Sequence, residues 1–316
     1  MPKVSVIVFA DNTALVLARC LYSIVIQTLT DTEVIVICNR GAYQCISTCN
    51  NFAERHGNVR IVQLDAPSLA DAYDTGISKA CGKYIMFVKA DDFLSPKACE
   101  LMYDNAIKND SDLVKCGILQ YSSFKDEYYS LKWESNILSK IAESDDVFLL
   151  EQHKELLTYH GSVWATLFKT DFISGMKFSE GCGASHQDFA YIIKAMVCAS
   201  RISVVNDTLY VWNINDAEYP ASNTSEALLG IIDPFESIKN WLVERGCFDD
   251  YIPELYKQIM IVTMGYYNFM SDELKPVFFK QLQQFYSDVN MFVFPRVTQM
   301  FSTPQVRFLI DILKDN

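Results

Sequence analysis

Short apolar runs alternate with helical patterns along the first 120 residues, and this alternation constrains the fold more than any other feature. The runs are nearly continuous in Val and Ile, as is typical of strands that are covered on both faces of a parallel sheet. Strands joined by helices form right-handed βαβ units. We therefore expect a doubly wound, mostly parallel α/β sheet. Its strands are predicted at Val4–Val8, Glu33–Ile37, Val59–Gln63, Tyr84–Val88 and Leu113–Leu119, and its helices at Ala14–Gln27, Tyr43–His56, Ser68–Ala80 and Pro96–Asn109.

The pattern loosens after Tyr121. Residues Ser122–Asp145 are polar and aromatic with little periodicity, which predicts a loop or a hairpin over the sheet. A turn-rich polar segment, Asn213–Ser225, marks a boundary. We expect one α/β domain over residues 1–215 and a helical C-terminal extension over residues 216–316. Further elements are predicted as helices at Phe148–His160, Gln187–Ala199, Leu228–Arg245, Ile252–Phe269, Asp272–Asp288 and Pro304–Lys314, and as strands at Ile202–Val205 and Leu209–Trp212.

Composition excludes several classes of protein. A formal net charge of −12 argues against a general nucleic-acid surface, which needs an excess of Lys and Arg. The ten cysteines form no C-x-x-C pair, which favours free thiols in a reducing compartment. We find no basic and apolar leader, and no apolar run near the ~20 residues that span a bilayer. These features predict a cytoplasmic protein, with peripheral contact at the inner face of a membrane left open.

The segment Gly82–Pro96 points to chemistry. A buried strand, Tyr84–Val88, runs into Asp91 and Asp92, and Ser95 with Pro96 is typical of a helix start. Open α/β sheets bind ligands at the carboxyl ends of their strands, so carboxylates there suit a metal ion or a nucleoside diphosphate. A dinucleotide-binding oxidoreductase is disfavoured because no G-x-G-x-x-G follows the first strand.

Taken together, the motifs of residues 3–215 resemble a family-2 inverting glycosyltransferase of the GT-A fold, of the kind that builds bacterial surface polysaccharide. The order and spacing of these motifs carry the resemblance, because each motif alone is a weak signal. The matching stretches are Lys3–Val8 with Asn12, Arg19–Ile24 with Gln27–Leu29, Gly76–Ile85, Asp91–Pro96, Trp164 with Leu167–Lys169, Gly183–Asp188, Arg201–Val205 and Leu209–Tyr210.

The resemblance implies roles for two carboxylates. In such enzymes an Asp-x-Asp motif holds Mg²⁺ or Mn²⁺ on the donor diphosphate, and Asp91 is the matching metal carboxylate here. A downstream Asp takes the proton of the acceptor hydroxyl as that oxygen attacks the anomeric carbon, and Asp188 matches it. The alternative for Asp188 is a helix N-cap, since it precedes an apolar helical run.

The departures from the family pattern gather at the donor site. Lys89 stands where the pattern has the first Asp of Asp-x-Asp, Arg40 where it has the Asp of Asn-Asp-Gly, and Tyr73 where it has a donor-site Arg. A divalent cation beside Lys89 is disfavoured by charge repulsion. Two interpretations follow: Lys89 and Arg40 neutralise the diphosphate and the reaction needs no metal, or the donor site is broken and the protein is a non-catalytic partner of another glycosyltransferase. A solvated Lys89 without a role is the third.

The resemblance thus implies a UDP-linked nucleotide sugar as donor and a glycan or lipid-linked acceptor, in polysaccharide or lipopolysaccharide synthesis. Self-association and association with another protein stay open. His186 ligates a metal, orients the acceptor or is a surface His beside a helix start, and the sequence favours the last. The candidate nucleotide-sugar site comprises Phe9, Asp11, Asn12, Arg40, Tyr73, Lys89 and Asp91, and the candidate acceptor side comprises Trp164, His186 and Gln187.

Overall fold

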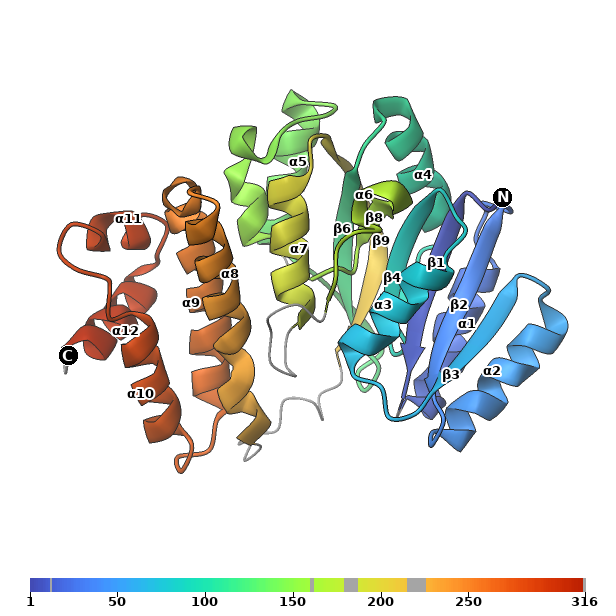
Figure 1. The fold of residues 1–316 in the computed structure, drawn as a ribbon, viewed down its shortest axis with the longest axis horizontal. Helices are drawn as coiled ribbons and strands as arrows, with labels where there is room; N and C mark the ends of the chain where they lie inside the picture. The colour runs from blue at the N-terminus through green and yellow to red at the C-terminus, as the bar shows by residue number, and fades with distance from the viewer. Residues whose placement is uncertain (12, 160–161, 179–186, 215–225, 315–316) are drawn as a thin grey trace. The chain divides into compact units, whose positions relative to one another are not determined.

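The computed structural model describes residues 1–11, 13–159, 162–178, 187–214 and 226–314. They form two compact units (Figure 1). The first comprises 1–153, 162–180 and 195–215, and the second comprises 154–161, 181–194 and 216–316. The second unit therefore combines the predicted C-terminal extension with two short segments from earlier in the chain. The predicted boundary at residue 215 stays a prediction.

The first unit is built on a nine-stranded sheet with the order β3-β2-β1-β4-β8-β6-β9-β5, and β7 pairs with β6 (Figure 1). The pairs β3–β2, β2–β1, β1–β4 and β6–β9 are parallel, and the pairs through β8, β7 and β5 are antiparallel. The predicted mostly parallel sheet is confirmed. The strands are β1 Val4–Ala10, β2 Thr32–Asn39, β3 Val59–Leu64, β4 Tyr84–Lys89, β5 Phe93–Leu94, β6 Leu113–Ser122, β7 Glu127–Ser130, β8 Thr166–Lys169 and β9 Ile202–Ile214.

Helices connect the parallel strands. The helices α1 (Ala14–Val25) and α2 (Tyr43–Arg55) contact each other, and α3 (Leu69–Lys79) contacts β1 and β2. The strand order places β2 and β3 on one side of β1, and β4 on the other side. Right-handed crossovers therefore put α1 and α2 on one face of the sheet and α3 on the opposite face. Helices on both faces explain why every residue of β1 except Phe9 is buried.

The structure differs from the sequence prediction in the middle of the chain. Residues 122–145 contain β7 and a helix, α5 (Lys132–Ser144), in place of a loop or hairpin alone. The predicted helix Phe148–His160 is two short 3₁₀ segments, Leu150–Gln152 and Lys154–Thr158. The two predicted strands after residue 201 are the single strand β9, whose pairing with β6 shifts register around Gly117. The polar residues inside β9 gave it the pattern of two strands.

Helix α4 (Ala98–Asn109) begins later than its sequence signal. The Ser95 carbonyl accepts the Ala98 N–H, and no side chain caps the helix. Ser95 and Pro96 therefore belong to the turn that follows β5, and the true start lies two residues beyond Pro96. The turn still fixes the helix, because Gln27, two residues after the end of α1, donates to the Ser95 carbonyl and accepts the Cys99 N–H.

The second unit is helical. Helix α9 (Ile252–Phe269) contacts α10 (Lys275–Phe285), α11 (Phe294–Thr298) and α12 (Thr303–Leu313), while α8 (Asp233–Glu244) precedes it in the chain. Aromatic side chains fill its interior, including Tyr256 and Tyr286, whose ring centres lie 5.6 Å apart with the rings tilted by 44°. Among the described residues, no helix combines the length and apolarity needed to cross a bilayer.

Candidate active site at the end of β4

The site begins where β4 ends in a tight turn, Lys89–Asp92. The Asp92 N–H donates to the Lys89 carbonyl at 3.1 Å, which closes the turn. Lys89 is in parallel register with Phe9, so the end of β1 lies beside it. The turn therefore occupies the carboxyl edge of the sheet, next to the strand from which Phe9 and Asp11 extend.

Lys89 lies between a carboxylate and an aromatic ring. Its ammonium nitrogen is 3.5 Å from Asp91 Oδ2 and 4.7 Å from the centre of the Trp164 ring. The side chains of Lys89 and Asp91 are 27% and 12% exposed. Such a cation is held by both charge and ring quadrupole. Lys89 is thus a positioned cation at the strand edge, and a freely solvated side chain is not what the structure shows.

Helix α1 fixes the backbone of the turn from one side. Arg19 donates to the Asp91 carbonyl at 3.4 Å, and its guanidinium lies over the rings of Phe93 and Tyr121. The Cys20 thiol donates to the Lys89 carbonyl at 3.3 Å. Burial, together with the nearby carboxylates, raises the pKa of Cys20, which keeps its proton available for this bond.

Strand β9 fixes the turn from the other side through Asp92. One Asp92 oxygen accepts the Tyr210 hydroxyl at 2.5 Å, and the other accepts the Asn213 N–H at 2.8 Å. The Tyr210 oxygen in turn accepts the Lys89 N–H at 3.2 Å. Full burial raises the pKa of Asp92 to about 7, although Lys89 and both hydrogen bonds act in the opposite direction. Asp92 therefore links the end of β4 to β9.

The pKa of Asp92 predicts a pH-dependent stability. Because it lies above the ordinary value of 3.8, the folded protein binds more protons here than the unfolded chain between about pH 4 and 7. This group's contribution to stability is therefore lost as pH rises through that window, by up to about 4 kcal/mol. Asp92→Asn mimics the protonated carboxyl, so we expect the variant to gain stability relative to wild type from pH 5 to pH 8.

Urea unfolding of wild type and Asp92→Asn at pH 5, 6, 7 and 8 measures this difference. All other titrating groups are common to the two proteins, so only the Asp92 contribution changes. Parallel stability curves would show that Asp92 is already charged in the folded protein throughout the range.

A buried lysine supports the loop that carries Trp164. Lys115 on β6 donates to the Ser162 carbonyl at 3.2 Å and to the Thr166 hydroxyl at 3.1 Å, and that hydroxyl donates to the Trp164 carbonyl. Ala165 has φ of +52°, a conformation that is costly for a residue other than glycine. The Cys116 N–H binds the Ala165 carbonyl at 3.0 Å. These bonds hold a strained loop against β6, with its Trp164 ring over Lys89.

The other predicted donor-site residues lie in different settings. Asp11 accepts the Asn39 side-chain amide at 2.8 Å, which joins the ends of β1 and β2. Arg40 is 60% exposed and pairs with Asp65 at 3.2 Å. Tyr73 on α3 is only 1% exposed and packs against Phe87 and Phe178. The structure thus brings Phe9, Asp11, Lys89 and Asp91 to one edge and leaves Tyr73 in the core, while Asn12 lies outside the described residues.

The predicted base belongs to the second unit. Asp188 is 8% exposed and lies in the first turn of α7 (Gln187–Cys198), followed by Phe189, whose ring packs on Phe235. Its position inside the helix differs from the predicted N-cap alternative, in which it would precede the helix. A carboxylate in a first turn is favoured by the helix dipole. Gln187 is described only as the first residue of α7, and His186 lies outside the described residues.

The residues at the turn do not fit the divalent cation of the family pattern. Because Lys89 replaces one carboxylate of the family pattern and Asp92 is buried against β9, Asp91 is the one partly exposed carboxylate of this turn. Charges 4 Å apart interact by about 4 kcal/mol at an effective dielectric near 20, so a dication beside the Lys89 ammonium meets about twice that repulsion. In the part of the chain that the structure describes, no three His, Cys, Asp or Glu side chains group as metal ligands.

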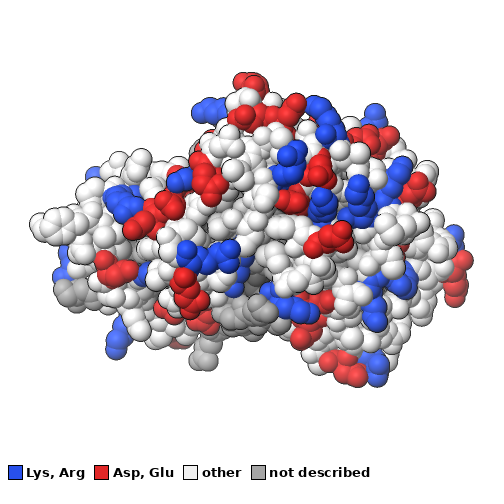
Figure 2. Space-filling view, turned by 45° about the horizontal axis from the view of Figure 1, so that its top comes forward, with Lys and Arg blue, Asp and Glu red and all other residues white. Residues whose placement is uncertain are grey.

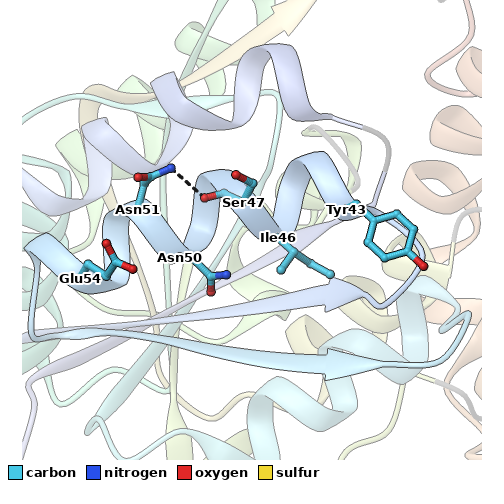
Figure 3. Close-up of a pocket in the computed structure, with 6 residues that line it drawn as sticks. All are labelled: Tyr43, Ile46, Ser47, Asn50, Asn51 and Glu54. Carbon is cyan, nitrogen blue, oxygen red and sulfur yellow. Dashed lines mark hydrogen bonds between the residues drawn. The ribbon is translucent and has the colours of Figure 1, made fainter.

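A surface depression lies elsewhere, along α2 (Figure 3). Its lining comes from one face of that helix: Tyr43, Ile46, Ser47, Asn50, Asn51 and Glu54. A single helix face without convergent groups from other elements lacks the form of a small-molecule site. Figure 2 shows Lys and Arg interspersed with Asp and Glu over the face that it draws, as is ordinary for a globular protein. Neither feature is a better candidate for a ligand-binding site than the turn after β4.

Sequence reasoning missed three residues that build the site: Arg19, Asp92 and Tyr210. Arg19 and Tyr210 belong to the stretches that carry the family resemblance. The resemblance thus marked both positions, but it assigned no function to either side chain. Asp92 lies directly beside Asp91 in the acidic pair. What was missing was knowledge that Tyr210, 118 residues away, donates to it.

Comparisons with known proteins agree with this geometry. The family described as "Glycosyl transferase family 2" matches residues 5–172. The uncharacterized glycosyltransferase EpsJ of Bacillus subtilis (strain 168) is 26% identical over 68% of this chain, and the match spans 62% of EpsJ. The chain therefore matches less than two thirds of that relative's length.

Solved structures share the fold. TarS 1–349 of S. aureus in complex with UDP-GlcNAc superimposes with a TM-score of 0.73 at 18% identity, over 94% of this chain and 84% of that one. The mannosyltransferase PcManGT of Pyrobaculum calidifontis, in complex with GDP-Man and Mn²⁺, gives 0.57 at 15% identity, over 98% and 86%. The expected GT-A-like sheet with a helical C-terminal region is confirmed.

Proposed function

The chain belongs to glycosyl transferase family 2, and we propose that it moves a sugar from a nucleotide-sugar donor to a glycan acceptor with inversion at the anomeric carbon. The observation that carries the proposal is the turn after β4. Its backbone is tied to α1 and β9, and it presents Lys89 and Asp91 at the carboxyl edge, where open α/β sheets bind ligands. The fixed ammonium of Lys89 favours a diphosphate at this edge.

A UDP-linked donor is favoured by the solved relatives. TarS 1–349 has been solved with UDP-GlcNAc and with UDP. A glycan or lipid-linked acceptor, a role in cell-surface polysaccharide or lipopolysaccharide synthesis, and a cytoplasmic location at or near the inner face of the membrane complete the proposal. Phe9, Asp11, Asn12 and Arg40 remain candidates for contacts with the nucleotide, and Trp164, His186 and Gln187 for contacts with the acceptor.

The proposed reaction has one chemical step. The acceptor hydroxyl oxygen forms a bond to the anomeric carbon, from the face opposite the diphosphate, as its proton passes to the Asp188 carboxylate. The bond between the anomeric carbon and the diphosphate oxygen breaks, and the nucleoside diphosphate leaves with the electron pair. Attack from the opposite face inverts the anomeric centre. Positive groups at the diphosphate stabilise the charge that develops on the leaving group.

A panel of α-linked UDP and GDP sugars tests the proposal, with nucleotide release and the anomeric proton coupling of the product as readouts. We expect release from at least one UDP sugar and a β-linked product. Neither binding nor release with any donor, under conditions in which a relative with an intact Asp-x-Asp motif is active, would contradict the enzymatic proposal and favour a non-catalytic partner protein.

A further inference from the structure

We propose that the Lys89 ammonium takes the place of the divalent cation, binding the donor diphosphate directly, so that donor binding needs no metal. This inference rests on the proposed function and assigns the chemistry of its donor site. The ligand is a nucleoside diphosphate, recognised by a fixed cation at the end of β4.

The location of Lys89 supports this role. As the last residue of β4, it lies in register with Phe9 at the carboxyl edge of the parallel strands. Its side chain is about one quarter exposed, so part of it is accessible from solvent. A cation at this edge can therefore neutralise a diphosphate, which is the role that a metal bound by Asp91 would have.

The orientation of Lys89 is fixed by two neighbours. Asp91 Oδ2 lies 3.5 Å from the ammonium, and the face of the Trp164 ring lies 4.7 Å from it. The carboxylate charge and the ring quadrupole together hold the ammonium at this edge. Asp91, which matches a metal ligand of the family pattern, is therefore the counter-ion of a lysine in this chain.

The support beneath Trp164 makes the arrangement rigid. The buried Lys115 binds the loop at Ser162 and Thr166, and β6 binds the Ala165 carbonyl. A fixed side chain loses less conformational entropy on binding than a mobile one, so a held ammonium binds a phosphate more tightly. Trp164 is therefore a positioning residue for Lys89.

Arg40 does not share this role in the structure. It is largely exposed and pairs with Asp65, and it extends from the end of β2 rather than β4. Exposed pairs of this kind contribute little and are readily exchanged. The sequence predicts that Lys89 and Arg40 neutralise the diphosphate together, whereas the burial and contacts in the structure favour Lys89 over Arg40.

Calorimetry with UDP and GDP, in EDTA or in Mn²⁺, tests the inference. Wild type is expected to bind one nucleotide with the same affinity in both solutions. Lys89→Met should weaken binding about 10- to 100-fold, the loss typical of a charge-assisted hydrogen bond. Lys83→Met, which removes the same charge from the exposed residue before the other end of β4, is the matched control and should bind as wild type does.

Lys89→Asp restores an Asp-x-Asp sequence and gives a second readout. In EDTA it should bind the nucleotide at least 10-fold more weakly than wild type, and Mn²⁺ should recover much of the loss. Trp164→Leu, with both carboxylate and lysine intact, should weaken binding several-fold, whereas Trp164→Phe should recover part of it.

The outcomes separate this inference from the proposed function. Binding by wild type only in Mn²⁺ overturns the metal-free inference and leaves the proposed function standing, as does a Lys89→Met variant that folds normally and keeps wild-type affinity. Binding of neither nucleotide in either solution contradicts the proposed donor site itself. Circular dichroism and thermal melting of each variant confirm that the comparison is between folded proteins.

Discussion

Replacing Asp188 with asparagine is expected to lower kcat about 10²- to 10⁴-fold, the contribution typical of a general base. Asparagine has the same size but takes no proton from an acceptor hydroxyl. Asp188 is almost fully buried in the first turn of α7, so the amide fits the same space. The affinity for the nucleotide should stay within about twofold of wild type, because the base acts on the acceptor and not on the diphosphate. Turnover and nucleotide calorimetry measure the two effects separately.

The Asp188→Asn experiment also decides between a chemical and a structural role. Losing a first-turn carboxylate costs about 0.3–1 kcal/mol of helix stability, too little to unfold the protein. Asp171→Asn, which changes an exposed carboxylate in the first turn of α6 (Thr170–Ile173), is the matched control and should leave kcat unchanged. If Asp188→Asn keeps wild-type turnover, Asp188 is structural and another group is the base.

Replacing Gly82 with alanine is expected to destabilise the first unit by about 3 kcal/mol, the largest loss of stability that we predict for a substitution. A Cβ at this position would lie 2.5 Å from the Ser5 nitrogen and 2.8 Å from the Val4 carbonyl carbon, both backbone atoms of β1. Because β1 is paired on both sides, its backbone has little room to shift. The bond from the Gly82 N–H to the Ser5 hydroxyl, 2.8 Å long, would be strained as well.

Urea denaturation followed by circular dichroism measures the Gly82→Ala effect as a lower transition midpoint. Gly175→Ala is the control, since nothing lies within 4 Å of the Cβ built there, and it should change stability by less than about 0.5 kcal/mol. Equal midpoints for both variants would contradict this prediction. They would mean that the backbone of β1 or of the start of β4 shifts to accommodate the added methyl group at little cost.

The sheet was predictable because its strands carry a local signal. In β1, β2 and β4 the Val- and Ile-rich runs are long enough to mark strands covered on both faces, and the structure extends each by only one to three residues. Helix α5 was missed for the opposite reason. Its sequence is polar and lies in a stretch without clear periodicity, so only the completed fold, in which α5 contacts β6 and β9, gives it a partner.

The candidate site was predictable as a place but not as a set of contacts. The acidic pair after a buried strand indicated the carboxyl edge, and the misplaced Lys89 was visible in the sequence. Its neighbours were not, because Trp164 and Tyr210 reach the turn from elements far along the chain. Tyr73 shows the converse error: a position aligned with a donor-site Arg holds a side chain that packs into the core.

A crystal structure of the protein with UDP, grown in the presence of a metal chelator, tests the central claim most directly. We expect a diphosphate oxygen about 3 Å from the Lys89 ammonium, at the edge formed by the ends of β1 and β4. The Trp164 ring should still lie over that ammonium. A diphosphate bound away from this edge, or nucleotide seen only when Mn²⁺ is added and Lys89 turns aside, would contradict the claim.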